Sequence, residues 1–181
     1  MLFRSVLGAG PIGNLVAQTA KGMGAAKVMI TDISDLRLKK AEECGIDICV
    51  NTKNKDFGEE MLKAFGPDKA DVIYDCAGNN VTMGQAIKYA RKGSVIVLIA
   101  VFAGPAQIDL AVVNDHELDI KSSMMYRHED YVDAIRLTGE GKVRLKPLIS
   151  RCFAFRDYLQ AYRYIDENRE NTMKVMIRVQ E

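Results

Sequence analysis

The stretch Ser5-Val6-Leu7-Gly8-Ala9-Gly10-Pro11-Ile12-Gly13 is the most informative part of this sequence. A short apolar run enters a G-x-G-x-x-G turn. Residues spaced as on one face of a helix follow it, namely Ile12, Leu15, Val16, Thr19 and Met23. Pro11 suits the first position of a helix, because its missing N–H would have no partner there. The stretch therefore predicts a strand, a tight turn and a helix.

A second apolar strand is expected over residues 27–31, and it ends at Asp32. In a dinucleotide site, Gly8 makes the tight turn, Gly10 lets the backbone approach the pyrophosphate, and Gly13 lets the helix pack closely on the strand. The N-terminus of the helix presents free N–H groups to the phosphates. The Asp32 carboxylate can accept hydrogen bonds from the adenosine ribose. The alternative is a plain strand-to-helix loop, but the acid at this distance favours a dinucleotide site.

The acid also bears on the choice of cofactor. The 2′-phosphate of NADP would lie against the Asp32 carboxylate, and Ile33 and Ser34 supply no cation to offset the repulsion. NAD is therefore the expected cofactor. Arg37, one helical turn further on, is a cation that keeps NADP open as an alternative.

Composition limits the possible classes of protein. The chain has 181 residues, 48% hydrophobic and 27% charged, which is typical of one soluble globular domain. The net charge of +1 provides no field of one sign, so nucleic acid and anionic membranes are not expected partners. The longest apolar run, residues 95–103, is too short for a membrane span. No secretory segment precedes the first strand, which favours the cytoplasm. The four cysteines form no C-x-x-C pair, so we expect them to be buried or incidental free thiols.

The chain up to residue 125 alternates between strand and helix patterns. Further strands are expected over residues 46–50, 71–75 and 94–101, with an edge strand over 117–125. This alternation predicts a doubly wound parallel sheet of about six strands with helices on both faces, the Rossmann arrangement. Ligands bind such sheets at the carboxyl ends of the strands. That edge should gather Gly8 to Gly13, Asp32, Cys76 to Gly78, and Ile99 to Val101.

The pattern changes beyond this region, which suggests a nucleotide-binding domain over residues 1–125 and a C-terminal extension over 126–181. In the extension we expect a helix over 131–138, an extended segment over 146–149, a helix that carries Tyr158, Ala161, Tyr162 and Ile165 on one face, and a last strand over 174–179. These apolar faces have no obvious sheet to cover. We therefore expect the extension to pack against something else.

Several segments together resemble the zinc-dependent medium-chain alcohol dehydrogenases, and in particular the sorbitol (polyol) dehydrogenases. They are GAGPIG at 8–13, TDISDLRLKKAEECGID at 31–47, DCAG at 75–78, HELDIKSSMMYRHEDY at 116–131, KPLISRCFAFRDYLQAYRYID at 146–166 and MKVMI at 173–177. The resemblance covers nearly the whole chain. It implies the NAD-binding portion of such an enzyme, with an extension that packs on a catalytic domain.

The resemblance also implies roles for individual residues. The pyrophosphate would be held by Gly8, Gly10, Pro11, Ile12 and Gly13, and the adenosine ribose by Asp32 and Arg37. The adenine side would be bordered by Cys76, Ala77 and Gly78, the nicotinamide by Ile99, Ala100 and Val101, and the carboxamide by the backbone of Ser123 and Met125. Cys76, Ile99 and Val101 could instead be buried strand residues of any such fold. Polyol dehydrogenases often have arginine at the position of Met125, so sorbitol is not carried over as the substrate.

No catalytic or metal-binding residue is predicted. Enzymes of this type hold their catalytic zinc with ligands from an N-terminal domain, whereas this sequence begins at the glycine turn. Its only histidines, His116 and His128, have no Cys or His at a ligand-like spacing. Zinc is therefore expected only in a complete enzyme. A short-chain reductase is disfavoured, because no tyrosine has a lysine four residues later.

The sequence thus favours a cofactor-binding portion that positions NAD for hydride transfer from an alcohol or polyol and is inactive alone. Two alternatives stay open. One is a free-standing NAD-binding module that senses the cofactor or docks on a partner, and the other is a small reductase with its own catalytic group, although no acid–base constellation is evident. An unpaired sixth strand also predicts a homo-oligomer, either a dimer or a tetramer.

Overall fold

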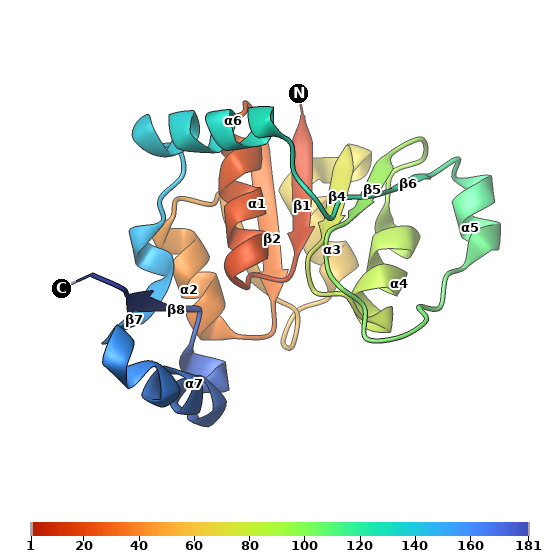
Figure 1. The fold of residues 1–181 in the computed structure, drawn as a ribbon. Helices are drawn as coiled ribbons and strands as arrows, with labels where there is room; N and C mark the ends of the chain where they lie inside the picture. The colour runs from red at the N-terminus through yellow and green to blue at the C-terminus, as the bar shows by residue number, and fades with distance from the viewer. Residues whose placement is uncertain (1, 181) are drawn as a thin grey trace.

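Six strands form a single parallel sheet in the computed structural model, which describes residues 2–180 (Figure 1). The strands are β1 (Phe3–Leu7), β2 (Lys27–Asp32), β3 (Ile48–Asn51), β4 (Val72–Asp75), β5 (Val95–Leu98) and β6 (Asp119–Ser122). Their order is β3-β2-β1-β4-β5-β6, and every neighbouring pair is parallel. This is the doubly wound order of a Rossmann fold, so the predicted fold class is confirmed.

Helices cover both faces of this sheet. They are α1 (Pro11–Gly22), α2 (Asp35–Glu43), α3 (Phe57–Phe65), α4 (Asn80–Tyr89) and α5 (Leu110–Asp115). Val6 packs in a cluster with residues of α1 and α2, whereas its neighbour Leu7 packs in another with residues of α3 and α4. Both side chains are fully buried. Successive strand residues point to opposite faces, so this continuous apolar run reflects a sheet that is covered twice.

Side-chain caps begin several helices. The Asp56 carboxylate accepts a hydrogen bond from the N–H of Glu59 at 2.9 Å, and Asn79 forms a capping box with Thr82. The Ser34 side chain caps α2 in the same way. α5 was not predicted; it is only six residues long and is capped by Asp109.

Two strands are shorter than expected. The strand predicted over 94–101 is β5, which ends at Leu98, because the N–H groups of Ile99 and Ala100 both turn to the carbonyl of Asp75. The strand predicted over 117–125 is β6, which ends at Ser122. Among residues 2–180 its only neighbouring strand is β5, so pairing stops soon after β5 ends.

The chain after β6 forms α6 (His128–Gly139), which lies across one end of α1 (Figure 1). Leu137 of α6 is buried, and a side chain at Gly22 of α1 would meet Leu137 and Lys142. The two helices are therefore closely packed.

The last part of the chain is a small parallel unit, apart from the large sheet in Figure 1. It consists of β7 (Ile149–Ala154), α7 (Tyr158–Glu167) and β8 (Lys174–Arg178), and β7 pairs with β8. The extended segment predicted over 146–149 is instead the 3-10 helix η2 (Lys146–Leu148) leading into β7. The other 3-10 helices are η1 (Gly66–Asp68), η3 (Phe155–Asp157) and η4 (Arg169–Asn171). Among residues 2–180, no helix has the length and apolar character that crossing a membrane requires.

Candidate nucleotide-binding site

The glycine turn joins β1 to α1, and each glycine has a different constraint. Gly8 has a φ of 95°, a left-handed conformation that favours glycine. A Cβ on Gly13 would collide with the carbonyl oxygen of Gly8, so the helix could not lie this close to the turn with any other residue. Gly10 has open space where its Cβ would be. The turn therefore leaves an open approach to the backbone before α1.

A cleft of about 320 Å³ lies beside this turn. Six of the predicted residues line it: Gly8, Gly10, Asp32, Arg37, Cys76 and Ala77. The other residues that line the cleft were not predicted from the sequence. They are Thr31, Ile33, Thr52, Asn79, Thr82 and Gln85. Thr52 directly follows β3, so its place at the carboxyl edge of the sheet could have been inferred. Gln85 lies in the second turn of α4, and no sequence signal indicates that it faces the cleft.

The Asp32 carboxylate lies at the end of β2 and is only 8% exposed. One oxygen, Oδ2, accepts a hydrogen bond from the N–H of Ala9 at 2.7 Å, and Oδ1 accepts one from the N–H of Ser34 at 2.9 Å. Arg37 Nη1 is 3.7 Å from Oδ2. The predicted acid and cation therefore meet at one end of the cleft, where their charges largely balance.

Asp75 shapes the opposite wall, at the end of β4. It is fully buried, and its Oδ1 accepts hydrogen bonds from the N–H groups of Ala77 and Gly78 at 3.0 and 3.1 Å. Burial raises the pKa of the adjacent Cys76 thiol to about 12, and the charge of Asp75 adds to the shift. The thiol is therefore neutral near pH 7 and is a poor nucleophile.

The remaining predicted residues do not line the cleft. Gly13 lies behind the turn, and Pro11 and Ile12 form the start of α1. Gly78 packs against the loop after β5, since a Cβ there would meet Ala100 and Val101. The other positions, which follow β5 and β6, are Ile99, Ser123 and Met125.

Val101 and Met125 are about three-quarters exposed. The interpretation of Val101 as a buried strand residue is therefore wrong, because the chain has already left the sheet at Leu98. Ile99 and Cys76 are half-buried.

Residues 2–180 contain no group of three His, Cys, Asp or Glu side chains that could hold a metal ion. His116 ends α5 and His128 begins α6, so the two histidines belong to different helices. The nearest acid to His116 is its neighbour Asp115, at 3.7 Å.

Comparison with known proteins places this geometry in a family. Residues 11–140 match the family model ADH_zinc_N, described as zinc-binding dehydrogenase. The chain belongs to this family. It is 32% identical over 165 residues to sorbitol dehydrogenase 1 of Saccharomyces cerevisiae, a match that covers 88% of this chain and 46% of the relative. The chain thus spans about half the length of the curated dehydrogenases that it matches.

Solved dehydrogenase structures share the fold. An alcohol dehydrogenase from Escherichia coli CFT073, complexed with the cofactor NADH, has 28% identity and a TM-score of 0.84, covering 96% of this chain and 51% of that one. A zinc-binding dehydrogenase from Sinorhizobium meliloti 1021, bound to NADP, has 22% identity and a TM-score of 0.83, covering 97% and 52%. The second likeness shows the fold alone. The fold therefore does not by itself choose between NAD and NADP.

Proposed function

We propose that this chain is the NAD-binding part of a zinc-type alcohol or polyol dehydrogenase. The observation that carries the proposal is the cleft whose walls include both the open backbone of Gly10 and the carboxylate of Asp32. The turn, with no side chain at Gly10, fits a pyrophosphate at the N-terminus of α1. Bound NAD supplies a hydride acceptor at its nicotinamide ring.

The chain's own residues would hold and orient the dinucleotide. Asp32 accepts hydrogen bonds from the adenosine ribose, and Arg37 lies beside the same sugar. NAD is preferred because Asp32 would repel a 2′-phosphate, while Arg37 is already within 3.7 Å of this carboxylate. The loops after β5 and β6 would carry the nicotinamide end, through Ile99, Ala100, Val101, Ser123 and Met125.

A second half would complete the enzyme by supplying zinc ligands and binding the alcohol. An apolar groove of about 460 Å³ runs between α1 and α6, lined by Leu15, Thr19, Tyr131, Ala134, Ile135, Thr138, Val143 and Leu145. Helix α7 packs on the small β7–β8 sheet. We propose that residues 1–125 bind the nucleotide and that 126–181 face the catalytic half. On this basis the chain alone turns over no alcohol.

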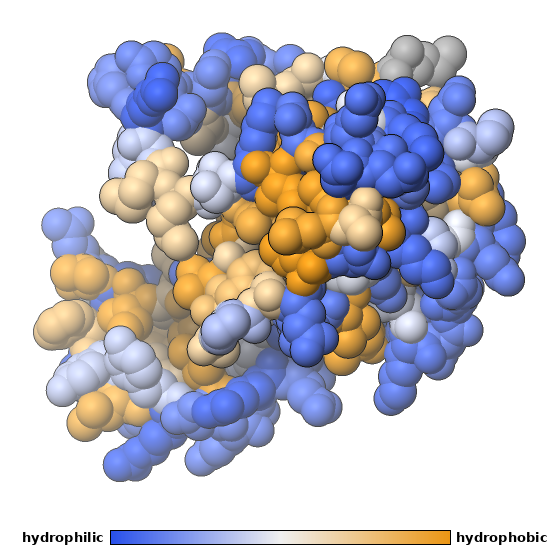
Figure 2. All heavy atoms as spheres, turned by 90° about the vertical axis from the view of Figure 1, so that its right-hand side faces the viewer, coloured by the Kyte–Doolittle hydropathy of each residue, from blue (hydrophilic) through white to orange (hydrophobic). Residues whose placement is uncertain are grey.

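We also propose that the chain forms a homo-oligomer through the edge of β6, and that it works in the cytoplasm. β6 pairs on one side with β5, which leaves its other side without a strand among residues 2–180. Exposed apolar side chains lie in the segment before β6, including Val101, Ile108 and Leu110. Figure 2, which faces this side of the molecule, shows apolar surface gathered there. Sedimentation should give a dimer or tetramer, and a monomer at high concentration would contradict the proposal.

Calorimetric titration of the purified chain with NAD and NADP, together with metal analysis, tests the cofactor proposal. We expect NAD to bind at one site, NADP to bind roughly tenfold more weakly or worse, and zinc to be absent. Oxidation of sorbitol by the chain alone, or stoichiometric zinc, would overturn the assignment as a partial enzyme. Binding of neither nucleotide would overturn the cofactor assignment.

The remaining alternative is a free-standing NAD-binding module. It predicts the same result in the titration with NAD and NADP. The coding region upstream must therefore distinguish the free-standing module from the dehydrogenase half. An upstream or continuous reading frame with zinc ligands supports the dehydrogenase half, and its absence supports the module.

A further inference from the structure

The Asp32 carboxylate is bonded to the glycine turn in the protein itself. Its Oδ2 accepts the N–H of Ala9 at 2.7 Å, although the two residues are 23 positions apart, with Ala9 in the turn after β1 and Asp32 at the end of β2. Both groups are shielded from water, since Ala9 is fully buried and Asp32 is 8% exposed. A hydrogen bond from a backbone N–H to a carboxylate is stronger than one to a neutral acceptor, particularly in a buried setting.

The turn needs such a contact because its own sequence makes it flexible. Gly8 and Gly10 flank Ala9, and glycine loses more conformational freedom on ordering than any other residue. Gly8 N–H donates to the carbonyl of Thr31 at 2.8 Å, and the carbonyl of Gly10 accepts from Asn14 at 2.9 Å. The bond from Ala9 to Asp32 lies between these two and fixes the middle of the turn.

The second oxygen of Asp32 ties the same carboxylate to the start of α2. Oδ1 accepts the N–H of Ser34, the residue that caps α2, at 2.9 Å. Arg37 lies 3.7 Å from Oδ2 and holds the charge in place. The carboxylate therefore connects the start of α2 to the turn that leads into α1.

We propose that Asp32 is a positioning residue for the glycine turn, in addition to being a ligand of the ribose. It holds Gly8 to Gly10 in the shape that receives a pyrophosphate before any nucleotide arrives. Asp32 thus contributes to binding of the pyrophosphate through Ala9, without touching it. This inference rests on the proposed nucleotide site.

Two nucleotides separate the roles of Asp32. ADP has ribose hydroxyls for the carboxylate to bind, whereas 2′,3′-dideoxy-ADP has none but keeps the adenine and the pyrophosphate. We expect Asp32→Ala to weaken binding of 2′,3′-dideoxy-ADP by about tenfold, as estimated from the loss of one buried hydrogen bond, and to weaken ADP further. If Asp32 acted only on the ribose, affinity for the dideoxy nucleotide would be unchanged, and the proposal would be wrong.

Asp35→Ala is the matched control for the loss of charge. Asp35 is an exposed carboxylate in the first turn of α2, and it bonds Asn51 instead of the turn. We expect this variant to bind both nucleotides within about twofold of the original protein, in keeping with the small energies of exposed charges. An equal loss for 2′,3′-dideoxy-ADP in both variants would mean that charge alone is responsible, and would contradict the proposal.

Hydrogen exchange of the Ala9 amide provides a test without nucleotide. We expect slow exchange in the original protein, intermediate exchange in Asp32→Asn, which keeps one acceptor oxygen, and the fastest in Asp32→Ala. Exchange of the β1 amides reports whether each variant is folded. Unchanged exchange at Ala9 in both Asp32 variants would overturn the positioning role. Failure of the original protein to bind any nucleotide would instead overturn the proposed function.

Discussion

The large sheet and the small C-terminal unit are both built from parallel strands joined by helices. They differ in how many faces of the strands are covered by helices. In the large sheet, Val6 and Leu7 point to opposite faces and each meets a layer of helices. In the small unit, residues 149–152 of β7 are exposed, and α7 packs on one face only. A parallel pair of strands gains little stability unless both faces are buried. Parallel strands joined by a helix therefore form a buried core in the large sheet, whereas in the small unit they leave one face of the strands exposed.

Local and long-range contacts hold the small unit in place. Phe153 and Tyr164 pack with ring centroids 5.7 Å apart, and the Arg151 guanidinium lies about 5 Å from both rings. Leu148 and Met173 form a minor buried cluster with Cys44, the residue at the end of α2. The small unit thus packs against the helices of the large sheet and, in the proposed enzyme, would also contact the second half.

The largest effect is expected from Gly13→Ala, at the glycine turn of the large sheet. Its Cβ would collide with the Gly8 carbonyl, so α1 must shift, with a loss of about 1–3 kcal/mol in unfolding free energy and loss of NAD binding. Urea unfolding and NAD titration measure the two effects. Gly10→Ala is the matched control, because its Cβ meets no atom and φ is −61°. That variant should unfold almost as the original does while binding NAD more weakly, and equal destabilisation of the two variants would refute the assignment.

Thiol reactivity should distinguish the two regions next. Burial raises the pKa of Cys49, on β3, to about 12, as it does for Cys76, whereas Cys152 on β7 is exposed. At pH 8 we expect iodoacetamide to modify Cys152 faster than Cys49 and Cys76 by a factor of about 100 or more, because the thiolate is the reactive form. Peptide mass spectrometry over time measures the rates. Comparable rates would indicate that the large sheet opens readily.

These two raised pKa values also predict a dependence of stability on pH. In the folded state the Cys49 and Cys76 thiols hold their protons to about pH 12, above their ordinary value of 9.0. Unfolded chains therefore bind fewer protons than folded ones between these values. The contribution to stability is complete below about pH 9 and is lost as the pH rises toward 12.

An intermediate effect is expected at Gln18, which attaches the extension to α1. This buried side chain accepts the N–H of Arg144 at 2.6 Å and donates to its carbonyl at 3.2 Å. Gln18→Ala leaves both backbone groups without that partner, at a cost of about 1–3 kcal/mol. Hydrogen exchange should increase over residues 143–148 and stay unchanged in β1 and β4. The control, Gln160→Ala on exposed α7, should change neither segment, and a faster exchange throughout the large sheet would contradict this account.

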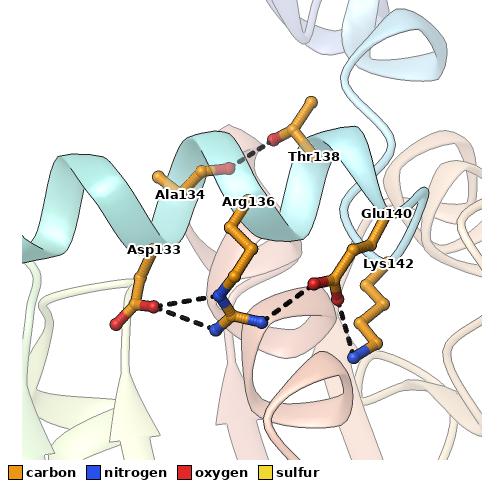
Figure 3. A network of polar contacts seen from close by, with 6 residues as sticks. All are labelled: Asp133, Ala134, Arg136, Thr138, Glu140 and Lys142. Carbon is orange, nitrogen blue, oxygen red and sulfur yellow. Dashed lines mark hydrogen bonds and ion pairs between the residues drawn. The ribbon is translucent and has the colours of Figure 1, made fainter.

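The smallest effect is expected on the outer surface of α6. Arg136 contacts Asp133 and Glu140, and Lys142 contacts Glu140 from the other side (Figure 3). These groups are about half exposed, so Arg136→Ala should lower the unfolding free energy by only about 0–1 kcal/mol, and less at high salt. Urea unfolding at low and high salt measures the difference. A large, salt-independent loss would mean that α6 depends on Arg136 for packing and not on Leu137.

Local chemistry in the sequence was sufficient for the turn, the start of α1 and the fold class. Gly8 and Pro11 each satisfy a backbone requirement of their own position, and Asp56 and Asn79 bond N–H groups two or three residues away. Apolar runs in β1 and β2 reflect burial on two faces. Each of these signals is contained within a few neighbouring residues, so the sequence by itself determined them.

Tertiary structure decided what depends on contacts between distant segments. It ended β5 at Leu98, where two N–H groups turn to Asp75, and it brought Thr52 and Gln85 into one cleft. It also bonded Asp32 to Ala9, a pairing that no local pattern indicates because the two residues meet only when β1 and β2 pair. Sequence patterns record the environment of each residue, whereas the partners of a buried carboxylate follow from how the strands are arranged.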